Sequence, residues 1–440
     1  MADVVGLPRR PIGTLQVPAI TIGLWQVAGG HGKINLDKAV QEMKVYAEAG
    51  LFAFDLADIY GPSEDLYGRF MKEKNDGVCA YGLTKFVPRP GPMTRPIVEM
   101  SIDRSMQKMG VSSLDMVQFH WKKALSFLQQ FDKAYAGGNF TEASKVRKVA
   151  TFLTGNAGQW WTTLLLQGQA MSTWIYFKQT FASAWFSDDF EGDVMTEWHQ
   201  LNAASCKNLD DYNRTFWKAL LPITSYRWDY EDERYLDAVR ALTELKEGGK
   251  IVEMGLTNFD TYHMNKILSS GCPIVSNQVA YSIIDTRPEK KMVPWCLQNN
   301  VKILAYGTLL GGFLAEKYIG KTEPKRYELN TSSLAKYKYV IDQWGSWPLF
   351  QELLLVLKGI ADKYRVSISN IAVRYIADKP AVGSVIVGAR LSIGEHIADN
   401  SRTFGFSGLD ASDLSSIHAI VHKGKPLVGD CGDEYRMVRR

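Results

Sequence analysis

The sequence predicts an α/β protein, a closed (β/α)8 barrel with an all-α domain inserted after the fourth strand. Three observations support this prediction. Eight short segments are almost continuously apolar, as expected for parallel strands buried on both faces. Segments of helical period separate them, which is typical of βαβ units. One long stretch, residues 122–227, lacks this alternation.

The strand candidates, in order, are residues 21–27, 51–58, 78–86, 114–121, 251–259, 273–282, 301–309 and 381–389. Residues 35–50 have the spacing of an amphipathic helix, and Gly50 is well placed to end it. Residues 4–20 are rich in turn formers, and we expect a hairpin there that plugs the barrel floor. Eight such units suit a barrel whose core typically has roughly 250 residues.

The alternation is interrupted between Trp121 and Trp228. When residues 122–227 are left out, the fourth strand leads into a short acidic loop and an amphipathic helix, which is the order that a barrel requires. The pattern of the interrupting stretch predicts several short helices separated by glycine and polar turns. We therefore expect a discontinuous barrel domain of residues 1–121 and 228–440 and an inserted helical domain of residues 122–227.

Composition narrows the class of protein. Lys and Arg number 51 against 47 acidic residues, a balance that does not favour a nucleic-acid binder or a polybasic membrane binder. The five cysteines include no C-x-x-C pair, which favours a reducing compartment over a disulfide framework or a zinc ribbon. The N-terminus lacks the apolar core of a secretory signal, and the densest apolar run, residues 349–359, is too short for a bilayer. We expect a cytoplasmic protein that binds no nucleic acid, membrane or metal.

Four groups capable of proton transfer follow consecutive predicted strands. Asp55 and Tyr60 follow the second strand, Lys85 the third and His120 the fourth. Active sites of such barrels lie at the C-terminal strand ends, so we expect the four at one face. Each alone has a structural explanation, such as an ion pair, a turn aromatic or a core histidine. Together they suit general acid catalysis at a carbonyl oxygen, with Lys85 lowering the pKa of Tyr60 and Asp55 keeping the lysine charged.

The motifs that contain these residues resemble those of the aldo-keto reductases. The segments FDLADIYGPSEDLYG, LTKF, LDMVQFHW, GLTNF, NQVAYS and ILAYGTLLGG occur in the order and at the spacing of that family. The resemblance covers nearly all of residues 10–121 and 228–410. It implies that the four residues form a catalytic tetrad, in which Tyr60 protonates the carbonyl oxygen while a nicotinamide delivers hydride to the carbon. His120 would orient the substrate and aid proton transfer.

The resemblance also implies a cofactor, NADPH, with NADH as the alternative. No G-x-G-x-x-G follows the first strand, so a Rossmann domain is not expected. Asn258, Gln278 and Tyr306 match the positions that hold the carboxamide and stack on the nicotinamide. Arg390 is the candidate for a 2′-phosphate contact, because a planar guanidinium can donate two hydrogen bonds to phosphate oxygens. The alternative is that Arg390 is a solvated surface residue without a role in cofactor binding. The other implied cofactor-binding positions are Gly23, Trp25, Thr257, Leu309, Gly311, Gly388, His396 and Asn400.

The sequence departs from the family pattern at two places near this cofactor. His396 stands where the family commonly has Gln or Arg, and the connection that leads to Asn400 is longer than usual. Gly307 replaces a serine that frequently follows the stacking tyrosine. These departures leave the choice between NADPH and NADH open.

The inserted stretch resembles the capsid N-terminal lobe of a gypsy-type retrotransposon Gag protein, through KVATFLTGNAGQWWTTLL, TWIYFKQTFASAWF and LDDYNRTFWKALL. No cysteine–histidine knuckle accompanies it, and its near-neutral charge does not predict RNA binding. Two hypotheses follow. The first is an NADPH-dependent oxidoreductase that reduces a small aldehyde or ketone to an alcohol. The second is an assembly protein, whose Gag-like lobe self-associates while the barrel serves as a cofactor-binding or display scaffold.

Overall fold

The computed structural model describes residues 7–32, 34–88, 92–121, 146, 161, 177, 230, 233–394 and 396–433. The chain divides into two compact units, residues 1–122 with 230–437, and residues 123–229 with 438–440. The first unit contains nearly all of the described residues. The helical composition predicted for residues 122–227 and their Gag resemblance lie outside the described residues.

Eight parallel strands close into a barrel in the order β10-β3-β4-β5-β6-β7-β8-β9. They are Ile20–Gly23 (β3), Ala53–Asp55 (β4), Tyr81–Phe86 (β5), Leu114–Phe119 (β6), Ile251–Thr257 (β7), Ser276–Ala280 (β8), Lys302–Tyr306 (β9) and Val382–Gly388 (β10). The last strand pairs with the first, with Gly388 opposite Gly23. The predicted closed barrel is therefore confirmed. Seven strands lie within their predicted segments, whereas β3 ends early because Trp25–Val27 forms a short 3-10 helix, η1.

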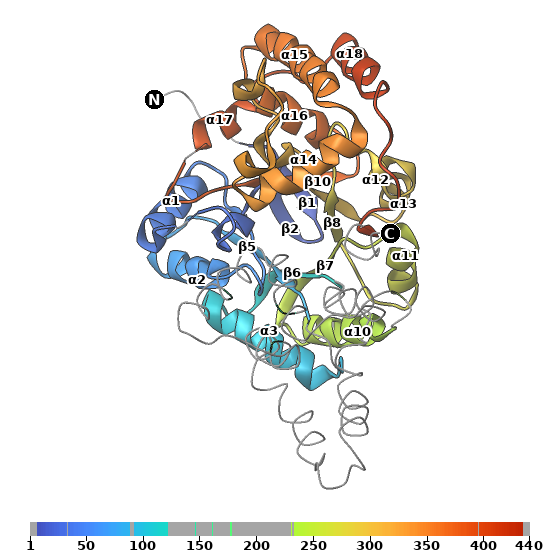
Figure 1. Ribbon diagram of the computed structural model, residues 1–440. Helices are drawn as coiled ribbons and strands as arrows, with labels where there is room; N and C mark the ends of the chain where they lie inside the picture. The colour runs from blue at the N-terminus through green and yellow to red at the C-terminus, as the bar shows by residue number, and fades with distance from the viewer. Residues whose placement is uncertain are drawn as a thin grey trace. The chain divides into compact units, whose positions relative to one another are not determined.

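Helices connect the strands and surround the barrel (Figure 1). They are Leu36–Glu48 (α1), Ser63–Glu73 (α2), Arg95–Met109 (α3), Arg234–Glu247 (α10), Thr261–Ser269 (α11), Arg287–Lys290 (α12), Met292–Gln298 (α13), Ser332–Trp344 (α14), Trp347–Tyr364 (α15), Ile368–Ala377 (α16), Ile397–Arg402 (α17) and Ala411–Val421 (α18). In the view of Figure 1, α1, α2, α3, α10 and α11 follow one another around the strands. In the described part of the chain, no helix combines the length and the apolar character needed to cross a membrane.

The local sequence explains where these helices begin and end. The Asn35 side chain accepts a hydrogen bond from the Lys38 backbone N–H and so caps α1. Gly50, two residues after α1 ends, has a φ of +88°, a conformation that favours glycine. Ser367 and Asn370 form a reciprocal capping box at the start of α16. The helix predicted over residues 35–50 therefore begins and ends close to the expected positions.

A hairpin closes the floor of the barrel. Strands Arg9–Ile12 (β1) and Leu15–Pro18 (β2) pair antiparallel, as expected for this segment. Ile12, Leu15 and Val17 are buried against apolar side chains from inside the barrel, namely Ala53, Leu83, Met116, Leu304 and Ile386. This apolar base leaves the other end of the barrel, where the strands reach their carboxyl ends, for polar groups.

Candidate active site

A buried ion pair joins the ends of β4 and β5. The Lys85 ammonium donates to both carboxylate oxygens of Asp55, at 2.6 and 2.7 Å, and to the Leu56 carbonyl oxygen at 3.0 Å. Only 1% of the Lys85 side chain and 4% of the Asp55 side chain are exposed. Burial lowers the pKa of Lys85 from its ordinary value, and the Asp55 carboxylate opposes that shift. Asp55 is therefore what allows a cation inside the barrel.

Tyr60 lies in the turn between β4 and α2. Its backbone N–H donates to the Ala57 carbonyl oxygen at 3.1 Å, and its own carbonyl accepts from Ser63 at 3.1 Å. The Lys85 ammonium lies 4.7 Å from the centroid of the Tyr60 ring. The phenol is therefore held next to the one cation that Asp55 fixes in place.

His120 follows β6 and belongs to a second polar group at the same strand ends. The Asn258 Nδ2 donates to the His120 Nε2 at 3.2 Å, and the Asn258 Oδ1 accepts from the Tyr306 hydroxyl at 2.8 Å. This pattern places the ring proton of a neutral His120 on Nδ1, because Nε2 must accept. Asn258 has a φ of 59°, in the left-handed region, and its backbone N–H donates to the Gln278 carbonyl at 2.8 Å. The structure thus brings four of the predicted residues, His120, Asn258, Tyr306 and Gln278, into one chain of contacts.

Gln278 lies inside the barrel rather than at its rim. Its side-chain nitrogen donates to Asp55 Oδ1 at 2.7 Å and to the side-chain oxygen of Gln118 at 2.7 Å. Gln118 was not among the residues expected from the sequence. The signal that identifies it is its place two residues before His120, because alternate residues of a strand point to the same face.

Several predicted cofactor positions gather at the carboxyl ends of β3, β7 and β10. A Cβ built on Gly388 would lie 2.2 Å from the Gln26 side-chain nitrogen, so this glycine gives room to another polar side chain. Several buried side-chain polar atoms have no hydrogen-bond partner in the described part of the chain, and three of them belong to residues at or after the ends of β3 and β7, namely Gln26 Oε1, His31 Nδ1 and Thr257 Oγ1. Buried polar atoms usually have partners. These atoms and the space-making glycine therefore fit a polar ligand such as a dinucleotide.

The connection after β9 supplies the next group of cofactor positions. Leu309 precedes the short 3-10 helix Leu310–Gly312 (η4), in which Gly311 has a φ of +67°. A Cβ on Gly311 would lie 2.8 Å from the Tyr337 ring and 2.9 Å from the Ser333 carbonyl oxygen. Only a glycine allows α14 to approach this closely.

α14 brings two further residues to the site. The Lys336 ammonium lies 4.9 Å from the centroid of the Tyr306 ring. At the start of the helix, Ser333 Oγ lies 2.8 Å from His31 Nε2, and the Ser332 backbone N–H donates to the Gly30 carbonyl at 3.1 Å. α14 therefore bridges the loop after β3 and the end of β9. No sequence pattern predicts these contacts, because they depend on the path of a long connection.

The last predicted cofactor residues follow β10. Arg390 is exposed, and its charge, after burial, is the second cause that lowers the pKa of His31. His396 lies at the start of α17, where its backbone N–H donates to the Tyr46 hydroxyl at 3.2 Å. Asn400 is buried in that helix. Arg390 and His31, which come from opposite ends of the chain, are thus close enough to influence each other.

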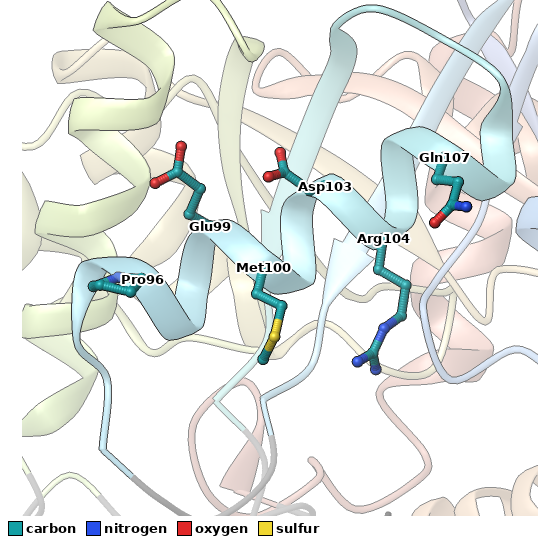
Figure 2. A pocket seen from close by; sticks show the side chains of 6 residues that line it. All are labelled: Pro96, Glu99, Met100, Asp103, Arg104 and Gln107. Carbon is teal, nitrogen blue, oxygen red and sulfur yellow. The ribbon is translucent and has the colours of Figure 1, made fainter. Parts of the chain in front are cut away.

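A separate surface hollow of about 500 Å³ lies on the exposed face of α3 (Figure 2). Its lining residues are Pro96, Glu99, Met100, Asp103, Arg104 and Gln107. Glu99 and Asp103 form ion pairs with Lys250, at 2.8 and 2.6 Å. The hollow contains no residue from the strand ends, and its acids are already paired, so we place the candidate site at the barrel mouth instead. Among the described residues, no group of three or more His, Cys, Asp or Glu side chains is arranged to hold a metal ion.

The fold and this site define a (β/α)8 barrel with a buried lysine–aspartate pair beside a tyrosine, and with a histidine at the end of the following strand. The model of the aldo/keto reductase family matches residues 19–133 and 205–422, which is more than half of the sequence. The chain belongs to the aldo/keto reductase family. The gap in the match, residues 134–204, falls within the stretch that interrupts the βα alternation.

Individual proteins are similar to parts of this chain or share its fold. Flagellar radial spoke protein 5 of Chlamydomonas reinhardtii is 30% identical over 149 residues, which are 33% of this chain and 28% of that protein. The NADH-specific methylglyoxal reductase of Escherichia coli is 24% identical over 180 residues, 40% of this chain and 50% of that protein. The chain thus spans half or less of the length of these relatives. The solved glycerol dehydrogenase of Gluconobacter oxydans has the same fold, with a TM-score of 0.60 at 16% identity over 98% of both chains.

Proposed function

We propose that this protein reduces an aldehyde or a ketone to an alcohol, with hydride from NADPH and a proton from Tyr60. The observation that carries the proposal is the position of the Lys85 ammonium, which is clamped by Asp55 at 2.6 Å and lies 4.7 Å from the Tyr60 ring. A fixed cation beside a phenol stabilises the phenolate that remains after proton transfer.

The other side chains divide the work of binding and orientation. A bound reduced nicotinamide supplies the hydride for the carbonyl carbon. Asn258 and Gln278 would hold its carboxamide, and Tyr306 would stack on its ring. His120, whose Nε2 lies 3.2 Å from Asn258 Nδ2, would use its ring N–H to orient the carbonyl oxygen towards the Tyr60 hydroxyl. The proton then passes from Tyr60 to that oxygen, while Lys85 compensates the charge left on the phenol.

The preference for NADPH depends on Arg390. Its exposed guanidinium, close enough to His31 to lower the pKa of that residue, is available to a 2′-phosphate. One relative is named as NADH-specific, so the cofactor preference of this chain needs its own measurement. The cytoplasmic location inferred from the cysteine pattern stays a prediction.

The test is NADPH oxidation against a panel of aldehydes and ketones. Tyr60→Phe should lower turnover by roughly 10²–10⁴-fold, as expected for the loss of a general acid, while NADPH still binds. Tyr262→Phe, on an exposed tyrosine of α11, is the matched control and should keep wild-type turnover. Full turnover by Tyr60→Phe would contradict its role as proton donor. A wild-type protein that oxidises NADPH with none of the carbonyls would contradict the reductase.

The second unit of the chain is proposed to be a domain inserted into this family barrel at residues 122–227. Two observations support the proposal: the family match has a gap at residues 134–204, and residues 123–229 form a compact unit. Self-association through this domain remains a proposal that an analysis of oligomeric state would test.

A scaffold that binds cofactor without turnover is the second candidate function. The similarity to a protein named flagellar radial spoke protein 5 favours it, because that name refers to a structure rather than a reaction. Saturable NADPH binding with no carbonyl reduction, by a protein that self-associates, is the result expected for this candidate.

A further inference from the structure

Gln118 is a buried amide in a place that usually holds an apolar side chain. It is 0% exposed and lies on β6 two residues before His120, so it points into the barrel. Interior layers of these barrels are filled mainly by branched apolar side chains, and a buried amide without partners is costly. Gly255 on the neighbouring strand lies next to it, because a Cβ on Gly255 would be in ordinary van der Waals contact with Gln118 Cγ at 3.5 Å.

The hydrogen bonds of Gln118 fix the orientation of its amide. Its nitrogen donates to Asp55 Oδ1 at 3.0 Å and to the Leu83 carbonyl oxygen at 3.2 Å. Its oxygen accepts from the Gln278 nitrogen at 2.7 Å. The reversed amide would place its oxygen against a carboxylate and a carbonyl, and its nitrogen against another nitrogen. Only one orientation satisfies the three partners.

Asp55, Gln118 and Gln278 form a closed triangle of hydrogen bonds. The Gln278 nitrogen donates to Asp55 Oδ1 at 2.7 Å as well as to Gln118. The three residues lie on the second, fourth and sixth strands of the barrel, and alternate strands contribute one interior layer. Asp55 Oδ1 therefore receives two amide N–H groups in addition to the Lys85 ammonium at 2.6 Å.

We propose that Gln118 is a positioning residue that holds the Asp55 carboxylate on Lys85 and couples it to Gln278. This inference rests on the proposed reductase function. The Gln278 nitrogen already donates to both Asp55 and Gln118, so a carboxamide ligand is left to donate to the Gln278 oxygen. A ligand that moves Gln278 thereby moves Asp55. Binding of the cofactor carboxamide at Gln278 is in this way coupled to the position of Asp55 and Lys85 beside the proton donor Tyr60.

The test compares Gln118→Met, Gln118→Glu and the control Ser276→Ala in the full chain. Methionine fills the space without an amide, and we expect it to lower kcat about tenfold, the effect of one lost hydrogen bond to a charged group. NADPH affinity should change little. Glutamic acid can donate to Asp55 only while it is protonated, because an ionised carboxylate has no proton to donate. It ionises at a higher pH than an isolated glutamic acid, because two adjoining carboxylates do not both ionise readily. Gln118→Glu should therefore approach wild-type kcat at acidic pH and lose it towards alkaline pH. Ser276→Ala, which alters another buried residue of the barrel interior, should keep the wild-type profile.

The outcomes separate this proposal from the proposed function. An active wild-type protein and a Gln118→Met variant with the same kcat and pH profile would overturn the positioning role alone, because a mere space filler is replaceable by methionine. If Gln118→Met does not fold, a pH profile of Gln118→Glu identical to that of the wild type overturns it. A wild-type protein inactive with every carbonyl would overturn the proposed function and this role with it.

Discussion

Removing the carboxylate from the buried ion pair tests the electrostatics of the site. In Asp55→Asn the Lys85 ammonium keeps the Leu56 carbonyl at 3.0 Å but loses a counter-charge that contacts it at 2.6 Å. At that distance the attraction is about 6 kcal/mol with an effective dielectric constant of about 20, and desolvation offsets part of it. We therefore expect the free energy of unfolding at neutral pH to fall by about 3–5 kcal/mol.

The pH dependence of this loss has a definite sign. Burial lowers the pKa of Lys85 below its ordinary value of 10.5, and without Asp55 the shift becomes larger. The unfolded lysine then binds more protons than the folded one between the two pKa values, so stability rises with pH in that window. The loss caused by Asp55→Asn should accordingly be greatest at neutral pH and shrink as the pH approaches 10.5.

Two variants complete this experiment. Lys85→Met leaves Asp55 with amide donors at 2.7 and 3.0 Å, so its loss should be smaller than that of Asp55→Asn. The double variant should lose much less than the sum of the two, because neither charge is left alone. Urea unfolding should be followed by hydrogen exchange in peptides from residues 51–121, because a chain with two compact units need not unfold in one step. A loss below about 1 kcal/mol, typical of an exposed ion pair, would refute the reasoning.

Three further predictions follow from other parts of the structure. Burial raises the pKa of Asp58 to about 8, so the folded state keeps a proton that the unfolded state loses near pH 4. The free energy of unfolding therefore falls as pH rises between these values. Asp58→Asn should raise the urea midpoint at pH 8 but not at pH 4, and the exposed control Asp76→Asn should change it at neither pH. Arg390→Ala should raise the dissociation constant of NADPH about tenfold more than that of NADH, whereas equal losses would place the phosphate contact elsewhere. Deletion of residues 122–227 should leave NADPH affinity unchanged and alter KM for bulky substrates; insolubility, or loss of cofactor binding, would show that the two units fold as one.

The deletion prediction has support on both sides of the interruption. Trp121 packs on Tyr235, with ring centroids 6.1 Å apart, and Tyr230 packs on the same ring at 5.7 Å. The residues that flank the interruption are therefore anchored in one aromatic cluster next to His120. A shortened connection should keep this cluster, because all three aromatic residues remain.

The sequence was sufficient to predict the closed barrel and the strand ends at which its ionisable groups lie. Apolar strands at regular spacing indicate a barrel, and Asp55, Lys85 and His120 each stand at or just beyond the carboxyl end of a strand. The contacts of Lys336 and His31 could not be predicted in this way. They depend on how residues 307–346 fold back over the barrel, and nothing in the local pattern of that segment fixes its path.

Gln118 was not predicted from the sequence, but it could have been found from strand geometry, because alternate residues of a strand point to the same face. The residue two positions before each of these interior polar groups is apolar and belongs to the base of the barrel. These residues are Ala53 before Asp55, Leu83 before Lys85 and Met116 before Gln118. The interior therefore changes from apolar to polar within one repeat of the strand. Electrostatic interactions in the upper layer are strong because the base beneath it excludes water. The same base makes any unpaired charge in that layer costly. A polar layer of this kind is stable only when its amides complete the hydrogen bonding of its carboxylate, which is the condition that Gln118 and Gln278 meet.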